Sequence, residues 1–260
     1  MVTGIEKFHE AFADYADNYV IIGGVACAYH ESEAEQMPRK TKDIDMILVV
    51  EALSDAFVKR FWEFVKAANY ADCNVGSSGV PQRHQFYRFK NPAVPNYPFQ
   101  IELFSRKLDC IKVPDDAHLT TVPAGDDLSS LSAILMSDDY YNFTIRHSME
   151  VGKVHIASPE SLIALKCRAY LEMIRMKEAG EMVDSKNIKK HKNDVFRLLA
   201  TIPASASFSA PESIIQDIEQ FCRMVKNDLP MPEMFKEARI RRPNPMAMLE
   251  FLSQIFRADK

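Results

Sequence analysis

The 260-residue chain has no apolar run long enough to cross a bilayer, which excludes a membrane-spanning segment of ordinary length. Its five cysteines are scattered and odd in number, so neither a disulfide framework nor a zinc site is predicted. The first residues, MVTGIEK, match neither a signal peptide nor a transit peptide, and no internal repeat is present. We therefore expect a cytoplasmic protein with reduced thiols and no membrane partner.

Charge is distributed unevenly along a chain that is long enough for two domains. Residues 1–157 hold 15 Lys and Arg against 22 Asp and Glu, while residues 158–260 hold 17 against 14. An acidic half and a mildly basic half fit metal binding beside contact with a polyanion. The basic excess is too small to predict nucleic-acid binding by itself.

The stretch from Tyr19 to Val50 carries the strongest pattern in the chain. Tyr19–Ile22 is a short apolar run, typical of a buried strand, and it ends at Gly23-Gly24, where a turn leads into a helix. Without Cβ atoms, two glycines let a ligand approach the main chain, and the free N–H groups at a helix start favour phosphate. Alone, the same residues also fit an ordinary turn.

Two aspartates open the next predicted strand, which runs from Asp43 to Val50. Apolar residues alternate along it, and period two places Asp43 and Asp45 on one face. Side by side they repel each other, and a divalent cation such as Mg²⁺ relieves the repulsion. Alternatively, both acids are exposed at a strand end and pair with Arg39, Lys40 or Lys42.

Together these two motifs resemble the polymerase-β-like nucleotidyltransferase superfamily. Gly23-Gly24 followed by Arg39-x-Thr41-x-Asp43-Ile44-Asp45 is most similar to the toxin-type branch of abortive-infection toxin–antitoxin systems. The resemblance extends from Tyr19 to about Leu199. Many members carry Gly-Ser where this chain has Gly-Gly, so backbone contacts to phosphate would remain while a hydroxyl contact is missing.

The resemblance implies roles for these residues. Gly23 and Gly24 would hold the β- and γ-phosphates of a nucleoside triphosphate, with Arg39 and Thr41 at the entrance. Asp43 and Asp45 would bind two Mg²⁺ ions, or Mn²⁺. A third carboxylate, Glu102 in the predicted strand Phe99–Phe104, matches by order and context the family's third ligand and catalytic base. Otherwise Glu102 is an outward-facing acid on a half-exposed strand.

The second half is predicted to be helical. Ser158-Pro159-Glu160 is typical of a helix start, with Ser158 as the cap, and we place the domain boundary there. Lys166 ends a Leu-x-Ala-x-Lys-like motif, which implies phosphate contact; a solvated lysine is the alternative. The segment 189–199 resembles the family's closing helix, with His191 in place of an aspartate and Asp194 kept, which we interpret as a structural ion pair.

Other elements follow from periodicity and composition. Helices are predicted over Glu6–Asp17 and Ser54–Asn69, and strands over His84–Phe89, Tyr140–Ile145 and Lys153–Ile156. Residues Thr201–Pro211 are predicted to be a linker, followed by helices over Glu212–Asn227, Pro232–Ile240 and Asn244–Phe256.

The predicted fold is α/β: a nucleotidyltransferase-like mixed sheet flanked by helices in residues 1–157, then an all-helical domain in residues 158–260. The expected reaction moves a nucleoside monophosphate from a nucleoside triphosphate to an acceptor hydroxyl on RNA, a protein or a small molecule. An enzyme of this kind could be a toxin that has an antitoxin protein as its partner. The alternatives are an inactive nucleotidyltransferase-fold binding module and a metal-dependent glycosyltransferase using Asp-x-Asp.

Overall fold

The computed structural model describes residues 4–73, 87–107, 119–122 and 131–258. The chain divides into two compact units. Unit 1 consists of Met1–Ala26, Lys40–Tyr141 and Ser148–Ala157, and unit 2 of Cys27–Arg39, Asn142–His147 and Ser158–Lys260. The chain passes from one unit to the other several times, and the last passage is at the predicted boundary after residue 157. The division into a catalytic domain (1–157) and a helical domain (158–260) remains a prediction.

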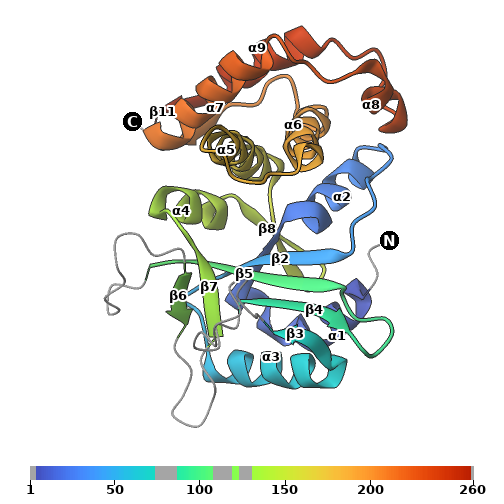
Figure 1. Ribbon diagram of the computed structural model, residues 1–260, viewed down its shortest axis with the longest axis vertical. Helices are drawn as coiled ribbons and strands as arrows, with labels where there is room; N and C mark the ends of the chain where they lie inside the picture. Colours follow the sequence, from blue (N-terminus) through green and yellow to red (C-terminus); the bar gives the residue numbers. More distant parts are fainter. Residues whose placement is uncertain (1–3, 74–86, 108–118, 123–130, 259–260) are drawn as a thin grey trace. The chain divides into compact units, whose positions relative to one another are not determined.

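Unit 1 holds a mixed sheet with helices (Figure 1). Its elements are α1 (Ile5–Phe12), the 3-10 helix η1 (Ala13–Asn18), β1 (Tyr19–Ile22), the start of α2 (Gly23–Glu33), β2 (Asp43–Leu48), α3 (Asp55–Ala68), β3 (Tyr70–Cys73), β4 (Arg88–Pro92), β5 (Gln100–Arg106), β6 (Leu119–Val122), β7 (Leu131–Met136), the start of α4 (Asp138–Arg146), β8 (Ser148–Val151) and β9 (Val154–Ala157).

Within the described residues, nine strands form this sheet in the order β3-β4-β5-β2-β1-β9-β8, with β7 also paired to β5 and β6 paired to β7. β2 runs antiparallel to β1 but parallel to β5, so the sheet is mixed. The fold class is therefore α/β, as the sequence predicts. β2 lies between β1 and β5, which brings the end of β1 and the acid of β5 beside the two aspartates.

An aromatic core fixes one face of the sheet. Rings from α1, α3, β1 and β4 contact one another, as in the pairs Phe8–Tyr19 at 5.4 Å and Phe61–Phe89 at 5.4 Å. Phe8, Tyr19, Phe61 and Phe89 are almost completely buried, and α1 and α3 lie together on this face in Figure 1. The aromatic stripe in α3 is thus core, and Ser54 caps the helix by accepting a hydrogen bond from the Phe57 N–H at 3.2 Å.

Alternation in β2 and β5 sends the polar side chains to the opposite face. Ile44 and Met46 are fully buried, whereas Asp43 and Asp45 are half-buried. Strand β5 repeats the pattern, with Ile101 buried and Glu102 half-buried. Because neighbouring residues on a strand point to opposite faces, the acids are held away from the aromatic core.

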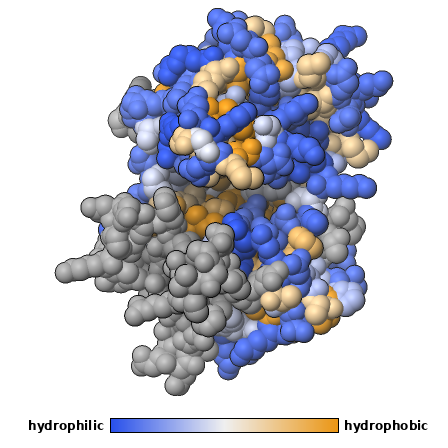
Figure 2. Space-filling view, in the orientation of Figure 1, coloured by the Kyte–Doolittle hydropathy of each residue, from blue (hydrophilic) through white to orange (hydrophobic). Residues whose placement is uncertain are grey.

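Unit 2 is built mainly from helices. Its elements are the remainder of α2 and α4, α5 (Pro159–Glu178), α6 (Ser185–Leu199), β10 (Phe208–Ala210), α7 (Glu212–Val225), α8 (Pro232–Glu237), α9 (Pro245–Ile255) and β11 (Phe256–Ala258). α5 packs against both α6 and α7, with Tyr170 and Phe221 in edge contact at 5.1 Å. The face of these helices seen in Figure 2 is mostly hydrophilic, with small hydrophobic areas between.

Three sequence predictions are corrected. Tyr140–Ile145 is not a strand but lies within α4, where buried Tyr140, Phe143 and Thr144 follow helical spacing. Unit 2 is not wholly helical, since β10 within the predicted linker pairs with β11 and Phe208 packs on Phe256 at 5.5 Å. α5 begins as predicted with proline in its first turn, but the Ser158 side chain makes no capping hydrogen bond.

Other predicted elements are confirmed with shifted ends. β5 and β9 match the predicted strands, while Glu6–Asp17 is α1 followed by η1. Of the predicted strand His84–Phe89, residues 84–86 lie outside the described residues, and β4 begins at Arg88. None of the helices in the described ranges is long and apolar enough to span a membrane.

Candidate active site

The glycine turn of unit 1 lies directly against an aspartate. Gly23 follows β1 with a φ of +67°, a left-handed backbone conformation that residues with a side chain rarely adopt. A Cβ atom at Gly23 would lie 2.9 Å from Asp45 Cγ and closer still to Asp45 Oδ2. The sequence therefore needs glycine here for two reasons: the backbone turn and the space that the Asp45 carboxylate occupies.

Gly24 has a different neighbour. A Cβ atom at this position would lie 2.6 Å from Thr41 Oγ1, which is closer than real Cβ contacts allow. Thr41 thus occupies the space that a side chain on Gly24 would need, and it places a hydroxyl at the turn. The structure brings together three of the predicted nucleotide-binding residues, Gly23, Gly24 and Thr41.

The strand register brings the predicted acids together. β2 and β5 pair in parallel with Asp43 opposite Gln100 and Asp45 opposite Glu102. Residues paired in this register point to the same face, and Asp43 is two residues from Asp45, so all three acids share one face. Glu102 is not on the opposite side of the sheet, an arrangement that would have removed the basis for a shared site.

The acids differ in their partners. Asp43 Oδ1 is buried and has no hydrogen-bond partner among the described residues. A buried carboxylate oxygen without a partner is costly, and a cation would satisfy it. Glu102 instead forms an ion pair with Arg88, which lies opposite it across the β4–β5 pair.

These contacts decide how a metal ion fits. No group of three or more His, Cys, Asp or Glu that could hold a metal ion occurs among the described residues. Mg²⁺ needs only one or two protein carboxylates when water and substrate phosphates complete its shell. Asp43 and Asp45 fit that limited requirement, whereas Glu102 would first have to leave Arg88.

Unit 2 contains the remaining predicted residues, Lys166 and Arg39, in what we call the Lys166 cluster: Lys166, Arg39, Asp194 and His191. Lys166 Nζ lies 3.1 Å from Asp194 Oδ2, and Arg39 Nε lies 3.4 Å from Asp194 Oδ1. The side chain of Lys166 is only 8% exposed and that of Asp194 only 2%, whereas that of Arg39 is 38% exposed. Lys166 is therefore a buried, paired lysine and not a solvated one.

Charge balance in this cluster favours the ionised aspartate. Burial alone would raise the pKa of Asp194, but Lys166 and Arg39 together hold that pKa below its ordinary value. The predicted ion pair of Asp194 is thus present, with two cations around one carboxylate.

His191 stands on α6 where the resembled family has an aspartate. Burial first, and then the positive charge of Lys166, lower the pKa of His191 to about 3. Its imidazole is therefore neutral at physiological pH, and its buried Nδ1 has no hydrogen-bond partner among the described residues. A neutral ring avoids adding a further positive charge beside Lys166.

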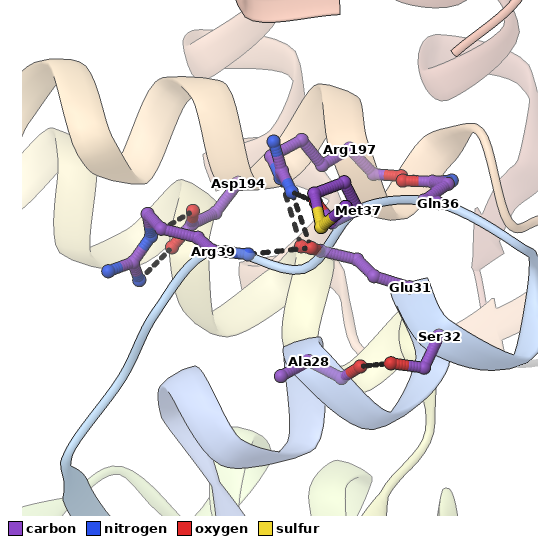
Figure 3. A network of polar contacts seen from close by, with 8 residues as sticks. All are labelled: Ala28, Glu31, Ser32, Gln36, Met37, Arg39, Asp194 and Arg197. Carbon is purple, nitrogen blue, oxygen red and sulfur yellow. Dashed lines mark hydrogen bonds and ion pairs between the residues drawn. The ribbon is translucent and has the colours of Figure 1, made fainter. Parts of the chain in front are cut away.

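A second buried ion pair lies beside this cluster, as Figure 3 shows. Arg197 on α6 donates to Glu31 on α2 from Nε at 3.1 Å and from Nη2 at 2.6 Å. Arg197 also donates to the Met37 carbonyl, and Glu31 accepts from the Arg39 backbone N–H at 3.4 Å. The segment that carries Arg39 is therefore anchored to α6, a role for Glu31 and Arg197 that sequence reasoning missed.

No protein-family model and no curated protein matches this chain. The function is therefore inferred from the geometry of the site and from the motifs in the sequence.

Proposed function

We propose that the protein is a nucleotidyltransferase that moves a nucleoside monophosphate from a nucleoside triphosphate to an acceptor hydroxyl. The observation that carries the proposal is the pairing of Asp45 with Glu102 on one face of the sheet, with Asp45 directly against the Gly23 turn. The nucleotidyltransferase-like arrangement of the sheet is part of this proposal.

Asp43 and Asp45 would hold Mg²⁺, because their carboxylates share a face and Asp43 Oδ1 has no hydrogen-bond partner within the described ranges. When bound, the ion would lower the pKa of the acceptor hydroxyl and offset the negative charge of the phosphates. The family resemblance implies two such ions.

The chain's own groups would orient the reaction. The acceptor oxygen attacks the α-phosphorus and forms a new O–P bond, while the bond from that phosphorus to the β-phosphate bridging oxygen breaks. Pyrophosphate leaves, and the hydroxyl proton passes to the Glu102 carboxylate. The backbone at Gly23 and Gly24 would admit the phosphates closely, and the Thr41 hydroxyl would donate to one of their oxygens.

The resemblance also assigns Lys166 and Arg39 to contact with the triphosphate, and that assignment stays a prediction from the sequence. Both belong to a cluster with two cations around one carboxylate, and part of Arg39 is exposed. The toxin role, the antitoxin partner and the location in the cytoplasm remain predictions from the sequence.

The ion pair between Glu102 and Arg88 favours a second candidate, a nucleotide-binding module without transfer activity. In that case Glu102 would stay with Arg88 and no base would be present at the site. The glycosyltransferase alternative gains no comparable support.

A labelling experiment distinguishes the nucleotidyltransferase from the nucleotide-binding module. The full chain is incubated with each α-³²P-labelled nucleoside triphosphate, Mg²⁺ or Mn²⁺, and total RNA, cell protein or small hydroxyl compounds. We expect one labelled acceptor class, loss of labelling with Asp45→Asn, and a fall of about 10²-fold with Glu102→Gln, the ordinary contribution of a general base. Glu150→Gln, an exposed acid on β8, is the matched control and should label normally. Nucleotide binding without any labelled acceptor would refute transfer and favour the binding module.

A further inference from the structure

Three arginines gather in unit 2 between α8 and α9, and none of them is among the residues assigned above. Arg239, Arg241 and Arg242 are exposed and line an open hollow of about 700 Å³. We call this the arginine hollow. None of the three guanidinium groups forms an ion pair with a residue in the described part of the chain, whereas most cations considered above are paired. Of the described residues that line the hollow, Glu35 is the one acid.

The backbone of this segment is held in an unusual conformation. Arg239 has a φ of +60° and Arg242 a φ of +48°, the left-handed region in which arginine is uncommon. Hydrogen bonds hold the segment after α8: Ile240 N–H donates to the Phe235 carbonyl at 2.9 Å, and Met37 N–H donates to the Ala238 carbonyl at 3.0 Å. Left-handed residues that carry side chains cost free energy and concentrate at functional sites.

The chemistry of the hollow indicates a ligand dense in negative charge. Three exposed guanidinium groups within four residues give the hollow a positively charged lining, and each can bind two phosphate oxygens at once. A nucleic-acid strand carries one charge per nucleotide and so can meet all three arginines together. An acidic protein would need several consecutive carboxylates to do the same.

We propose that the arginine hollow binds the phosphodiester backbone of a single-stranded nucleic acid. Its described lining includes the apolar residues Leu199, Ile240 and Met248 and no aromatic side chain. Aromatic stacking on bases is thus absent from the described lining, so the contact should be to the backbone and should tolerate different sequences. This proposal stands apart from nucleotide transfer, because its residues are not those of the acidic site.

The test measures binding of the full chain to a fluorescent single-stranded RNA and to DNA of the same sequence, by anisotropy at several salt concentrations. The variant Arg239→Gln/Arg241→Gln/Arg242→Gln should weaken binding at least tenfold at low salt. It should also reduce the magnitude of the slope of log K against log salt by about 2, because each of the three lost phosphate contacts contributes roughly 0.7. The control Arg223→Gln/Lys226→Gln/Arg257→Gln removes the same charge from exposed positions elsewhere in unit 2 and should keep most of the affinity.

Each outcome decides the proposal. Binding that the arginine variant weakens more than the control variant supports the proposal, and a preference for RNA or for DNA identifies which backbone is bound. No binding, equal losses in the two triple variants, or displacement by polyglutamate as effective as by unlabelled RNA would overturn it. The binding assay contains neither nucleoside triphosphate nor Mg²⁺, so failure of the transferase proposal and failure of this one can be told apart.

Discussion

Replacing Gly23 with alanine tests the contact between the turn and Asp45. The left-handed backbone conformation should cost about 1–2 kcal/mol with any ordinary side chain. The new methyl group would also lie 2.9 Å from Asp45 Cγ and 3.1 Å from Asp45 Cβ, so the carboxylate has to move, at about 1–3 kcal/mol for overpacking. The total expected loss in the free energy of unfolding is about 2–5 kcal/mol.

The chain offers a matched control for the backbone part. Gly152 has a φ of +63°, close to that of Gly23, but nothing lies within 4 Å of a Cβ atom placed there. Gly152→Ala should therefore cost only the backbone term. The difference between the two variants isolates the steric contact with Asp45.

Urea unfolding followed by tryptophan fluorescence measures this difference. Trp62 is the only tryptophan in the sequence and lies on α3 in unit 1, so its signal reports the unit that contains both glycines. In the double variant Gly23→Ala/Asp45→Ala, the steric part should largely disappear, since Asp45 Oδ2 and Cγ are removed. Equal losses for Gly23→Ala and Gly152→Ala, with no coupling to Asp45, would refute the proposed contact.

Three further predictions concern the charged groups. The pKa of Asp194 is below its ordinary value of 3.8. The ionised carboxylate therefore stabilises the folded chain above that value, and this contribution is lost as pH falls through the folded-state pKa. Asp194→Asn should lower the free energy of unfolding by about 3–5 kcal/mol at pH 7. In urea titrations the difference in the free energy of unfolding between wild type and Asp194→Asn should become smaller at acidic pH. A difference that stays constant with pH would contradict an ionised, stabilising Asp194. His191 has a folded-state pKa of about 3 against 6.5 when unfolded, so the unfolded chain binds more protons between these values. Stability should fall with decreasing pH there, by up to about 1.4 kcal/mol per pH unit, and His191→Gln should flatten the slope; an unchanged slope would exclude His191 as its source. Arg88→Gln removes the cation paired with Glu102 and should tighten Mn²⁺ binding about tenfold in an electron paramagnetic resonance titration, through the screened charge it removes; weaker or unchanged binding would argue against a metal at these acids.

Local pattern was enough to predict the central motifs. The apolar run before Gly23 and the alternation after Asp43 gave the correct strand, turn and strand, because both signals lie within a few residues of each other. The shared face of Asp43 and Asp45 follows from that alternation. Their alignment with Glu102 depends on a parallel register between strands about 50 residues apart in the chain, which no local pattern encodes.

The errors have the same origin. Tyr140–Ile145 is rich in aromatic and β-branched residues and so favours a strand, yet tertiary packing of Tyr140, Phe143 and Thr144 selects the helix. Glu31 and Arg197 form a buried pair although 166 positions separate them, so neither residue showed a signal in the sequence. Likewise, β10 lies within a segment of linker composition, because it pairs with β11 and Phe208 packs against Phe256.

The most direct test of the proposed site is a crystal structure with Mn²⁺ and a non-hydrolysable nucleoside triphosphate. An anomalous peak about 2.1 Å from oxygens of Asp43 and Asp45, with the phosphates beside Gly23, is the predicted result. Mn²⁺ bound elsewhere, or nucleotide bound with both aspartates free of metal, would contradict the account.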